Sequence, residues 1–460
     1  MKKALLVLSA ILLLTVLVVG ASVSASAEVV GGECGADGDY VTWSFDTSTL
    51  TLTISGEGDM RYYYYYDETP WYSSYSALIV KVVIKDGVTG IGNYAFYECS
   101  NLTSIEIPDS VTSIGDGAFH ECSSLMSIEI PDSVTSIGDG AFYYCSSLMS
   151  IEIPDSMTGI GRSVFSGCSS LMSIEIPDSV TGIGSYAFSS CSSLTSIEIP
   201  DSVTSISDGV FDYCRSLTSI EIPDSVTSIG DRAFYYCSSL TSIEIPDSVT
   251  SIGDRAFYEC ISLTSIEIPD SVTSIGDEAF CFCGRLTSIK LPSLTMVEGG
   301  WFNSCSHLKT VYIPTSVKML KNGAFSGTAL KTVIYCGTEA QWNAIAKVTN
   351  WDGGKNPTVQ YHEYDLEAVG ENLYKGVCIH CGVEIETSTN EPSTNEPSTN
   401  EPSTNEPSEV ETVTKIEYVY ITGEAKDQPF GCNSSATVGA GLMLLMALGA
   451  AGVCLKKKKF

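Results

Sequence analysis

A seven-residue motif, SIEIPDS, recurs at a constant interval along the middle of the sequence, and no other feature restricts the fold as strongly. It begins at Ser104 and occurs eight times, each copy starting 23 residues after the one before, until the copies lose fidelity near Lys290. A fixed period of about 20 to 29 residues is typical of a leucine-rich solenoid, in which each coil buries its apolar side chains against the next coil. The sequence therefore predicts a stack of similar coils.

One repeat unit, LTSIEIPDSVTSIGDGAFHEC, contains a single clear strand signal. Ile105, Glu106 and Ile107 alternate, which predicts a short strand with the isoleucines facing inward and the glutamate outward. Pro108 ends the strand because it has no backbone N–H to donate, and Asp109 suits the turn that follows. The VTSIG stretch is expected to be a second, shorter extended piece.

Twelve such units can be counted from Ile79 to Leu330. We therefore expect a β-rich leucine-rich-repeat solenoid over residues 79–337, with about 12 coils of 23 residues and one parallel strand per coil.

An N-terminal segment, residues 28–78, precedes the solenoid. Its alternating stretch from Tyr40 to Ser55 predicts a β-hairpin that caps the open end of the stack. The tyrosine run at residues 62–66 is expected to pack within this cap, with an exposed stacking surface for sugar or protein as the alternative.

The two ends of the sequence have the composition of export and anchoring segments. Residues 1–27 combine two lysines, an apolar run and an Ala-Ser-Ala cleavage site, which predicts a secretory signal peptide. Residues 436–455 form an apolar run long enough to cross a hydrocarbon core of about 30 Å, and the basic tail 456–460 is expected to stay inside. We expect a cell-surface protein with its N-terminus outside and a retained transmembrane anchor, with a removable sorting signal as the alternative.

Three segments connect the solenoid to this anchor. Residues 338–386 are expected to hold a C-terminal cap with a short closing helix and a small CxxC module. The motif STNEP occurs four times within residues 387–409, which predicts an extended, solvated stalk because it has no apolar side chains to bury. Residues 410–435 are interpreted as a juxtamembrane segment.

The formal net charge of −31 argues against a nucleic-acid partner, because a phosphate backbone binds to a basic surface. The four histidines show no motif that pairs them with a nucleophile, and the sequence has no glycine-rich phosphate loop or metalloprotease helix. We therefore predict no catalytic residues and no enzyme, with an envelope hydrolase as the least supported alternative.

The repeat unit resembles that of BspA-like leucine-rich repeat proteins, which occur on the surfaces of many bacteria and some protozoa. The resemblance runs from Ile79 to Leu330 and rests on the pattern LxxIxIPxxVxxIxxxAFxxC, although Ser110 stands where plain leucine-rich repeats have asparagine or cysteine. Family members are linked to adhesion to host matrix proteins and to surface antigens. The resemblance thus implies a surface interaction role, with host matrix proteins among the expected partners, but a repeat scaffold does not fix a ligand.

The outward glutamate of each unit belongs to a column that is a candidate ligand-binding surface. Stacked like charges repel one another, and bound cations or lysine-rich ligands would offset that repulsion. The alternative is that the outer face of a strand must be polar and that duplication copied one tolerated residue. The glutamate column consists of Glu106, Glu129, Glu152, Glu175, Glu198, Glu221, Glu244 and Glu267, and Lys290 interrupts it. The aspartates that follow each proline, from Asp109 to Asp270, are expected to bond to backbone donors in the turn.

The two positions after each AF pair vary between units and are often tyrosine. Because aromatic side chains dominate interface energetics, these edges are the first candidates for recognition of a specific partner, with simple tolerance at exposed sites as the alternative. The candidates are Tyr97, Tyr143, Tyr144, Tyr213, Tyr235, Tyr236 and Tyr258.

Nine cysteines share the 23-residue spacing, at Cys99, Cys122, Cys145, Cys168, Cys191, Cys214, Cys237, Cys260 and Cys283. We favour a buried ladder of free thiols, because free cysteine is among the most buried residue types. Stacked disulfides and a metal array are the alternatives. The pair Cys378 and Cys381 is half of a zinc-site signature. A bound zinc ion is therefore one interpretation of this pair, and a disulfide or free thiols are the alternatives. No other cofactor is expected.

These expectations combine into an adhesin-like function, in which a repetitive solenoid face binds extracellular proteins or glycans. A surface spacer without a specific ligand is the competing interpretation.

Overall fold

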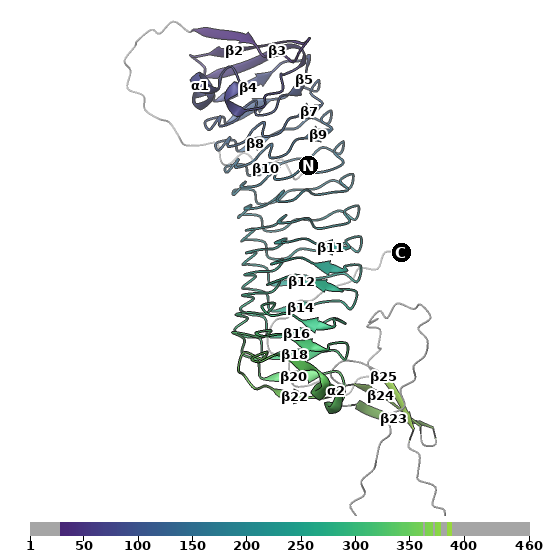
Figure 1. Cartoon of the computed structure of the whole chain (residues 1–460). Coiled ribbons are helices and arrows are strands. Elements are labelled where there is room, and N and C mark those ends of the chain that lie inside the picture. Colours follow the sequence, from purple (N-terminus) through teal and green to yellow (C-terminus); the bar gives the residue numbers. More distant parts are fainter. Residues whose placement is uncertain (1–27, 362–363, 371–372, 379–383, 389–460) are drawn as a thin grey trace, which may run out of the picture. The chain divides into compact units, whose positions relative to one another are not determined.

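A computed structural model describes residues 28–361, 364–370, 373–378 and 384–388 of the chain (Figure 1). The predicted signal peptide, juxtamembrane segment, transmembrane anchor and basic tail lie outside these residues, as does the STNEP stalk from residue 389 onward. Within the described part, no helix is long and apolar enough to cross a membrane.

The strand predicted from the SIE segment builds the first of two parallel ladders in the solenoid. Most of its strands pair in register one repeat apart, as Ile243 does with Ile266, so that the isoleucines stack inward. Inward side chains of one coil thereby contact the same side chains of the next coil. The three coils between Ile151 and Ser242 form no strand on this side. The ladder comprises β4 (Lys81–Ile84), β6 (Ser104–Glu106), β8 (Ser127–Ile128), β10 (Ser150–Ile151), β12 (Ser242–Glu244), β14 (Ser265–Glu267), β16 (Ser288–Lys290), β18 (Thr310–Ile313), β20 (Thr332–Tyr335) and β22 (Thr358–Gln360).

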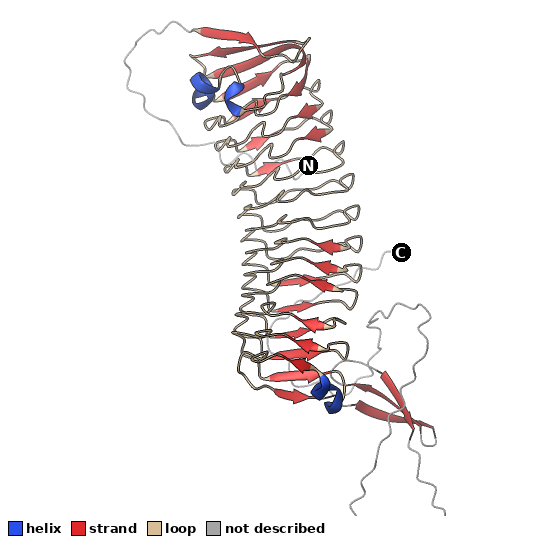
Figure 2. Ribbon diagram, viewed as in Figure 1, coloured by secondary structure: helices blue, strands red, loops and turns tan. Residues whose placement is uncertain are grey.

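The VTSIG segment builds a second parallel ladder, so the prediction of one parallel strand per coil was wrong. Ile252 pairs with Ile275, and in the middle coils, which Figure 2 draws as loops, isolated bridges join Ile160 to Ile183 and Ile206 to Ile229. The second ladder forms because buried backbone groups need partners, and the next coil supplies them here as well. It comprises β5 (Val88–Ile91), β7 (Ser113–Ile114), β9 (Ser136–Ile137), β11 (Ser228–Ile229), β13 (Ser251–Ile252), β15 (Ser274–Ile275), β17 (Met296–Val297), β19 (Met319–Leu320) and β21 (Ala346–Lys347).

The AFxxC segment forms the third side of each coil and is a chain of turns. Tyr94 and Glu98 have φ angles of 53° and 52°, a left-handed conformation that is uncommon outside glycine. The backbone N–H groups of both residues donate to the next coil, to Asp116 O and His120 O at 2.8 Å each. These bonds between coils stabilise the left-handed residues.

A column of phenylalanine rings runs through the core. Phe119 and Phe142 are typical: both are fully buried, and their ring centroids lie 5.2 Å apart with an interplanar angle of 5°. Trp71 stacks on the first ring, that of Phe96, and Trp351 packs edge-on against the last, that of Phe325. The column comprises Phe96, Phe119, Phe142, Phe165, Phe188, Phe211, Phe234, Phe257, Phe280, Phe302 and Phe325.

The nine spaced cysteines are buried and free, which confirms the interpretation as a thiol ladder. Each thiol from Cys122 onward donates to a phenylalanine carbonyl of the preceding coil, as Cys122 Sγ does to Phe96 O at 3.1 Å. Burial raises the pKa of the Cys122 thiol, so it stays protonated and unreactive.

The predicted hairpin at the N-terminal end of the solenoid is present. Strand β2 (Tyr40–Asp46) pairs antiparallel with β3 (Thr51–Asp59), and β1 (Val29–Glu33) adds a third strand. The two halves of β3 belong to different ladders, because its first half pairs in parallel with β4 and its last two residues pair with β5. Gly58 lies at this divergence with a φ of +102°.

The tyrosine run after β3 divides between the core and the surface. Tyr63 is buried, whereas Tyr62, Tyr64 and Tyr65 are exposed, so the expectation of packing was wrong for these three. They lie in a loop just before the short helices, where only one ring can turn inward. The helices are η1 (Tyr66–Glu68), α1 (Tyr72–Tyr75) and η2 (Ser76–Leu78).

Strands β21 and β22 continue the two ladders beyond the expected limit at residue 337, so the predicted closing helix, α2 (Glu339–Ala344), lies within the last coils. Thr338 begins it by accepting a hydrogen bond from the backbone N–H of Gln341, whose side chain bonds back to the Thr338 N–H. An antiparallel sheet of β23 (Tyr364–Gly370), β24 (Leu373–Cys378) and β25 (Glu384–Ser388) follows in the sequence.

Candidate functional site

The glutamate column lies on the outer side of the first ladder. All eight side chains are exposed, and Glu244 and Glu267 are direct partners in the parallel register. Lysines adjoin both ends of the column: Lys81 Nζ lies 2.6 Å from Glu106 Oε1, and Lys290 pairs in register with Glu267. This bond from Lys81 lowers the pKa of Glu106. In the described part of the chain, no ion pair reaches the six glutamates from Glu129 to Glu244, so these carboxylates face solvent.

The aspartates that follow each proline do not make the turn bonds that we expected. They are exposed, and the next residue bonds to the backbone instead, as Ser110 Oγ does to Val88 O at 2.8 Å. The turn orients the aspartate outward and the serine toward the preceding coil.

A different aspartate, that of the GDG and GDR segments, holds the coils together and was missed in the sequence. Asp116 Oδ1 accepts a hydrogen bond from the backbone N–H of Asp139 at 2.8 Å, and Asp231 does the same for Asp254. Its recurrence every 23 residues in most of the coils, interrupted by Arg162 and Ser185, was the available signal.

The first tyrosine cluster lies on the third side of the early coils. His120 is stacked between Tyr97 and Tyr143, with ring centroids 4.8 and 4.7 Å apart, and burial lowers its pKa. Tyr144 packs edge-on against Tyr143 and is 49% exposed. The rings therefore present edges and hydroxyl groups to solvent, because their faces contact one another.

The second tyrosine cluster lies on later coils. Tyr213 stacks on Tyr236 at 4.8 Å, and Tyr235 stacks on Tyr258 at 5.0 Å. Tyr236 donates a hydrogen bond to Glu259 Oε1 at 2.9 Å, and this bond raises the pKa of Tyr236 to about 12. All seven predicted tyrosines thus fall into two stacked clusters on one side of the solenoid.

An ion pair between a buried aspartate and a partly exposed arginine borders the second cluster and was not predicted. Asp212 is only 5% exposed and its Oδ2 lies 3.2 Å from Arg232 Nη2, whose guanidinium lies 4.2 Å from the Tyr235 ring centroid. Burial outweighs the arginine and raises the pKa of Asp212 to about 6. The coils between the clusters carry small side chains at the tyrosine positions, at Ser166, Gly167, Ser189 and Ser190.

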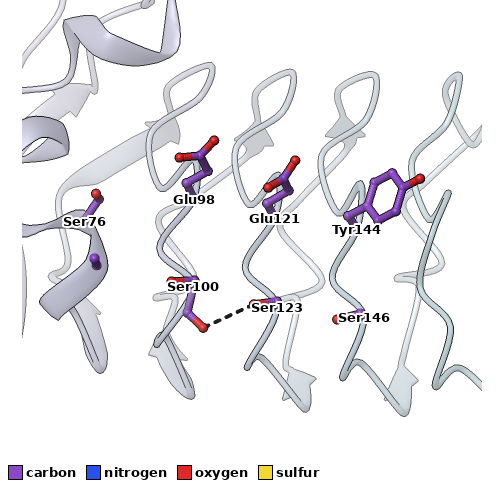
Figure 3. A pocket seen from close by; sticks show the side chains of 8 residues that line it. Ser76, Glu98, Ser100, Glu121, Ser123, Tyr144 and Ser146 are labelled. Atoms are coloured by element: carbon purple, nitrogen blue, oxygen red, sulfur yellow. Dashed lines mark hydrogen bonds between the residues drawn. The ribbon is translucent and has the colours of Figure 1, made fainter.

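A shallow groove of about 450 Å³ adjoins the first tyrosine cluster (Figure 3). Glu98, Glu121 and Tyr144 form one row on successive coils. Ser100, Ser123 and Ser146 form a parallel row, and Ser76 with Ala77 of η2 lines one end. The groove therefore offers two carboxylates and an aromatic ring beside a row of hydroxyl groups, which suits a cationic or hydroxylated ligand.

The structure does not test the proposed zinc at the CxxC module. Cys378 is the last residue of β24, whereas Cys381 lies outside the described residues. Among the residues that are described, no three histidine, cysteine or acidic side chains gather to hold a metal ion.

The chain is similar to known leucine-rich repeat proteins. Residues 71–169, 135–243 and 227–346, more than half of the chain in total, match the family described as BspA type leucine-rich repeat region, in six copies. A leucine-rich repeat protein from Eubacterium ventriosum is 25% identical with a TM-score of 0.51, covering 75% of this chain and 99% of its own. Another from Bacteroides ovatus is 27% identical with a TM-score of 0.50, covering 73% and 98%. No functionally curated protein matches.

Proposed function

This chain belongs to the BspA-type leucine-rich repeat family, and on that premise we propose that it is an adhesin-like surface protein that binds extracellular proteins or glycans. The two tyrosine clusters and the glutamate column are its binding surfaces. The proposed location rests on the export signal at residues 1–27 and the anchor at residues 436–455, with the solenoid outside the cell.

One observation carries this proposal: the fold does not need tyrosine at the positions of the clusters. Tyr143 N–H donates to the carbonyl of Gly140 at 2.9 Å, and Ser166, one repeat later, makes the same bond to Ser163 at 3.1 Å. Tyr144 and Gly167 are equally interchangeable, since each donates to the following coil, at 2.8 and 2.7 Å. The backbone of the coil is therefore independent of the ring. Tyr144 is exposed and the other cluster tyrosines are half-buried, and aromatic side chains at a protein surface are enriched where proteins bind partners.

Multivalency supports the same function. The glutamate column repeats a carboxylate on eight successive coils, about 4.8 Å apart, along the neighbouring side of the stack. A ligand with repeated cationic or hydroxyl groups can contact several coils at once, so weak contacts add to a useful avidity.

The test exchanges cluster residues for the residues that this chain itself uses in equivalent coils. Tyr143→Ser with Tyr144→Gly, and Tyr235→Ser with Tyr236→Ser, should preserve the circular dichroism spectrum and melting temperature. Binding of the purified chain to fibronectin, fibrinogen, mucin and cell-wall glycan is then measured at several salt concentrations. We expect saturable binding to one of these, weakened by the tyrosine variants; unchanged binding by both variants would remove the clusters from the proposal.

A spacer without a specific ligand is the second candidate, favoured by the unbroken phenylalanine column from Phe96 to Phe325. Such a column stabilises a stack regardless of any ligand. Absence of binding to every probe, together with a high melting temperature, would favour this second function.

A further inference from the structure

Three successive coils expose a methionine where the other regular coils have threonine. The position follows the buried leucine of each unit and is occupied by Thr103, Thr195, Thr218, Thr241, Thr264 and Thr287 elsewhere. Met126, Met149 and Met172 are 48%, 42% and 54% exposed. These side chains do not contribute to the core in the way that the preceding leucines do, which are fully buried.

The backbone keeps these methionines in register. Met149 N–H donates to Met126 O at 3.0 Å, and Ser169 Oγ, three residues before Met172, donates to Ser146 O, three residues before Met149, at 3.2 Å. Consecutive coils in a parallel ladder lie about 4.8 Å apart, so the three side chains form one apolar row spanning about 10 Å. We call this row the methionine stripe. Contiguous exposed apolar side chains of this kind mark interaction surfaces more often than isolated ones do.

A continuous acidic border runs along one side of the stripe. Three residues after each methionine comes an exposed member of the glutamate column, Glu129, Glu152 or Glu175, about 10 Å further along an extended chain. On the other side lies the groove, with Glu121 and the serine row. An apolar row beside an acidic border is complementary to a ligand with an apolar face and basic residues along one flank.

The charge of the glutamates and the spacing of the methionines limit the kind of partner that can bind to the stripe. A second copy of this chain, with its net charge of −31, or a membrane of anionic lipids would be repelled by the same glutamates. On an amphipathic helix, apolar side chains at positions i, i+3 or i+4, and i+7 span about 10.5 Å, which matches the row. The helix is about 10 Å wide, so basic residues on its flank reach the glutamate column. Methionine adapts to such a surface because its side chain is flexible and polarizable.

We propose that the methionine stripe, bordered by Glu129, Glu152 and Glu175, is a docking surface for a basic amphipathic helix of a partner protein. The inference deepens the proposed binding function, on which it rests, by naming a surface and the kind of partner. The apolar row of the helix packs on Met126, Met149 and Met172, and its lysines or arginines contact the glutamates.

The test uses the full chain and a fluorescent helical peptide of about 18 residues, with leucines on one face and lysines elsewhere. A peptide of the same composition with scattered leucines is the control for charge alone. Fluorescence anisotropy should show at least about tenfold weaker binding of the helical peptide to the Met126→Thr, Met149→Thr, Met172→Thr variant. The loss should persist at high salt, where contacts with the glutamates are screened.

A matched variant places the three methionines on later coils. Thr218→Met, Thr241→Met and Thr264→Met, added to the threonine variant, should restore binding on coils that carry their own column glutamates. Because every substitution copies a residue that the chain already uses at that position, folding should be preserved, and the melting temperature verifies this. If the wild type and the threonine variant bind the helical peptide equally, or if the two peptides bind equally, the proposal that the stripe is a docking surface is overturned. The tyrosine variants and the matrix or glycan probes test the broader binding function separately.

Discussion

Removing one ring from the middle of the phenylalanine column should destabilise the solenoid severely. Phe188 is fully buried, and its centroid lies 5.6 Å from that of Phe165 and 6.0 Å from that of Phe211. Truncation of a buried phenylalanine to alanine costs about 3–5 kcal/mol through lost burial and the cavity that remains. Loss of two stacked neighbours, each worth about 0.5–1.5 kcal/mol beyond burial, places Phe188→Ala in the upper part of that range.

Phe188→Leu separates the two contributions. Leucine retains most of the buried apolar volume but cannot stack, so its cost should be limited to roughly the aromatic contribution of about 1–3 kcal/mol. Because each coil contacts only its neighbours, the alanine variant should also uncouple the coils before residue 188 from those after it.

Denaturant unfolding followed by circular dichroism gives the free energies, and hydrogen exchange with mass spectrometry locates the loss of protection. We expect the alanine variant to unfold in two steps, with the fastest exchange in the coils around Phe188. A cost below about 1 kcal/mol, or exchange around Phe188 no faster than around Val82, would refute the account of the column as the main support of the stack.

Three further predictions concern single sites. Asp212 has a folded-state pKa raised to about 6 from 3.8, so its contribution to stability is complete below about pH 3.8 and is lost as the pH rises through about 6. Asp212→Asn should therefore be more stable relative to the wild type at pH 7.5 than at pH 4.5, and an equal difference at both pH values would contradict the raised pKa. Iodoacetamide should leave Cys122 and the other ladder thiols unmodified in the native chain and label them in guanidinium, as peptide mapping can verify; native labelling would exclude a buried ladder. Gly58→Val should lower the melting temperature, because the new Cβ would lie 2.3 Å from the Asp39 carboxylate and valine disfavours a φ of +102°; an unchanged melting temperature would show that β3 can diverge without glycine.

The solenoid could be predicted from the repeat unit, because the alternation of Ile105, Glu106 and Ile107 indicates which side chains face inward. The spacing of Cys122 and its equivalents likewise predicted a buried ladder. The second parallel ladder was missed because VTSIG contains a single inward isoleucine, Ile114, and its pairing depends on a coil 23 residues away.

The candidate binding surfaces could be predicted only in part from the sequence. Tyrosine frequency identified the residues of both clusters, but ring stacking such as that of His120 depends on the turn geometry of neighbouring coils. Asp109 and Asp116 look equally suited to turns, and only the left-handed backbone near Asp116 directs the second one toward the next coil. The exposure of Met126 could not be predicted from its residue type, because methionine is usually buried, and it depends on the corner at which the residue lies.

The parallel register has an evolutionary consequence. A chain that advances by 23 residues returns to the same place in the cross-section, where it meets the same partners. Unequal recombination between nearly identical repeats would therefore insert or delete whole coils and leave every interface between neighbours intact. The length of the acidic column, and the number of methionines or tyrosines displayed along it, can change in a single genetic event without any need to design a new core.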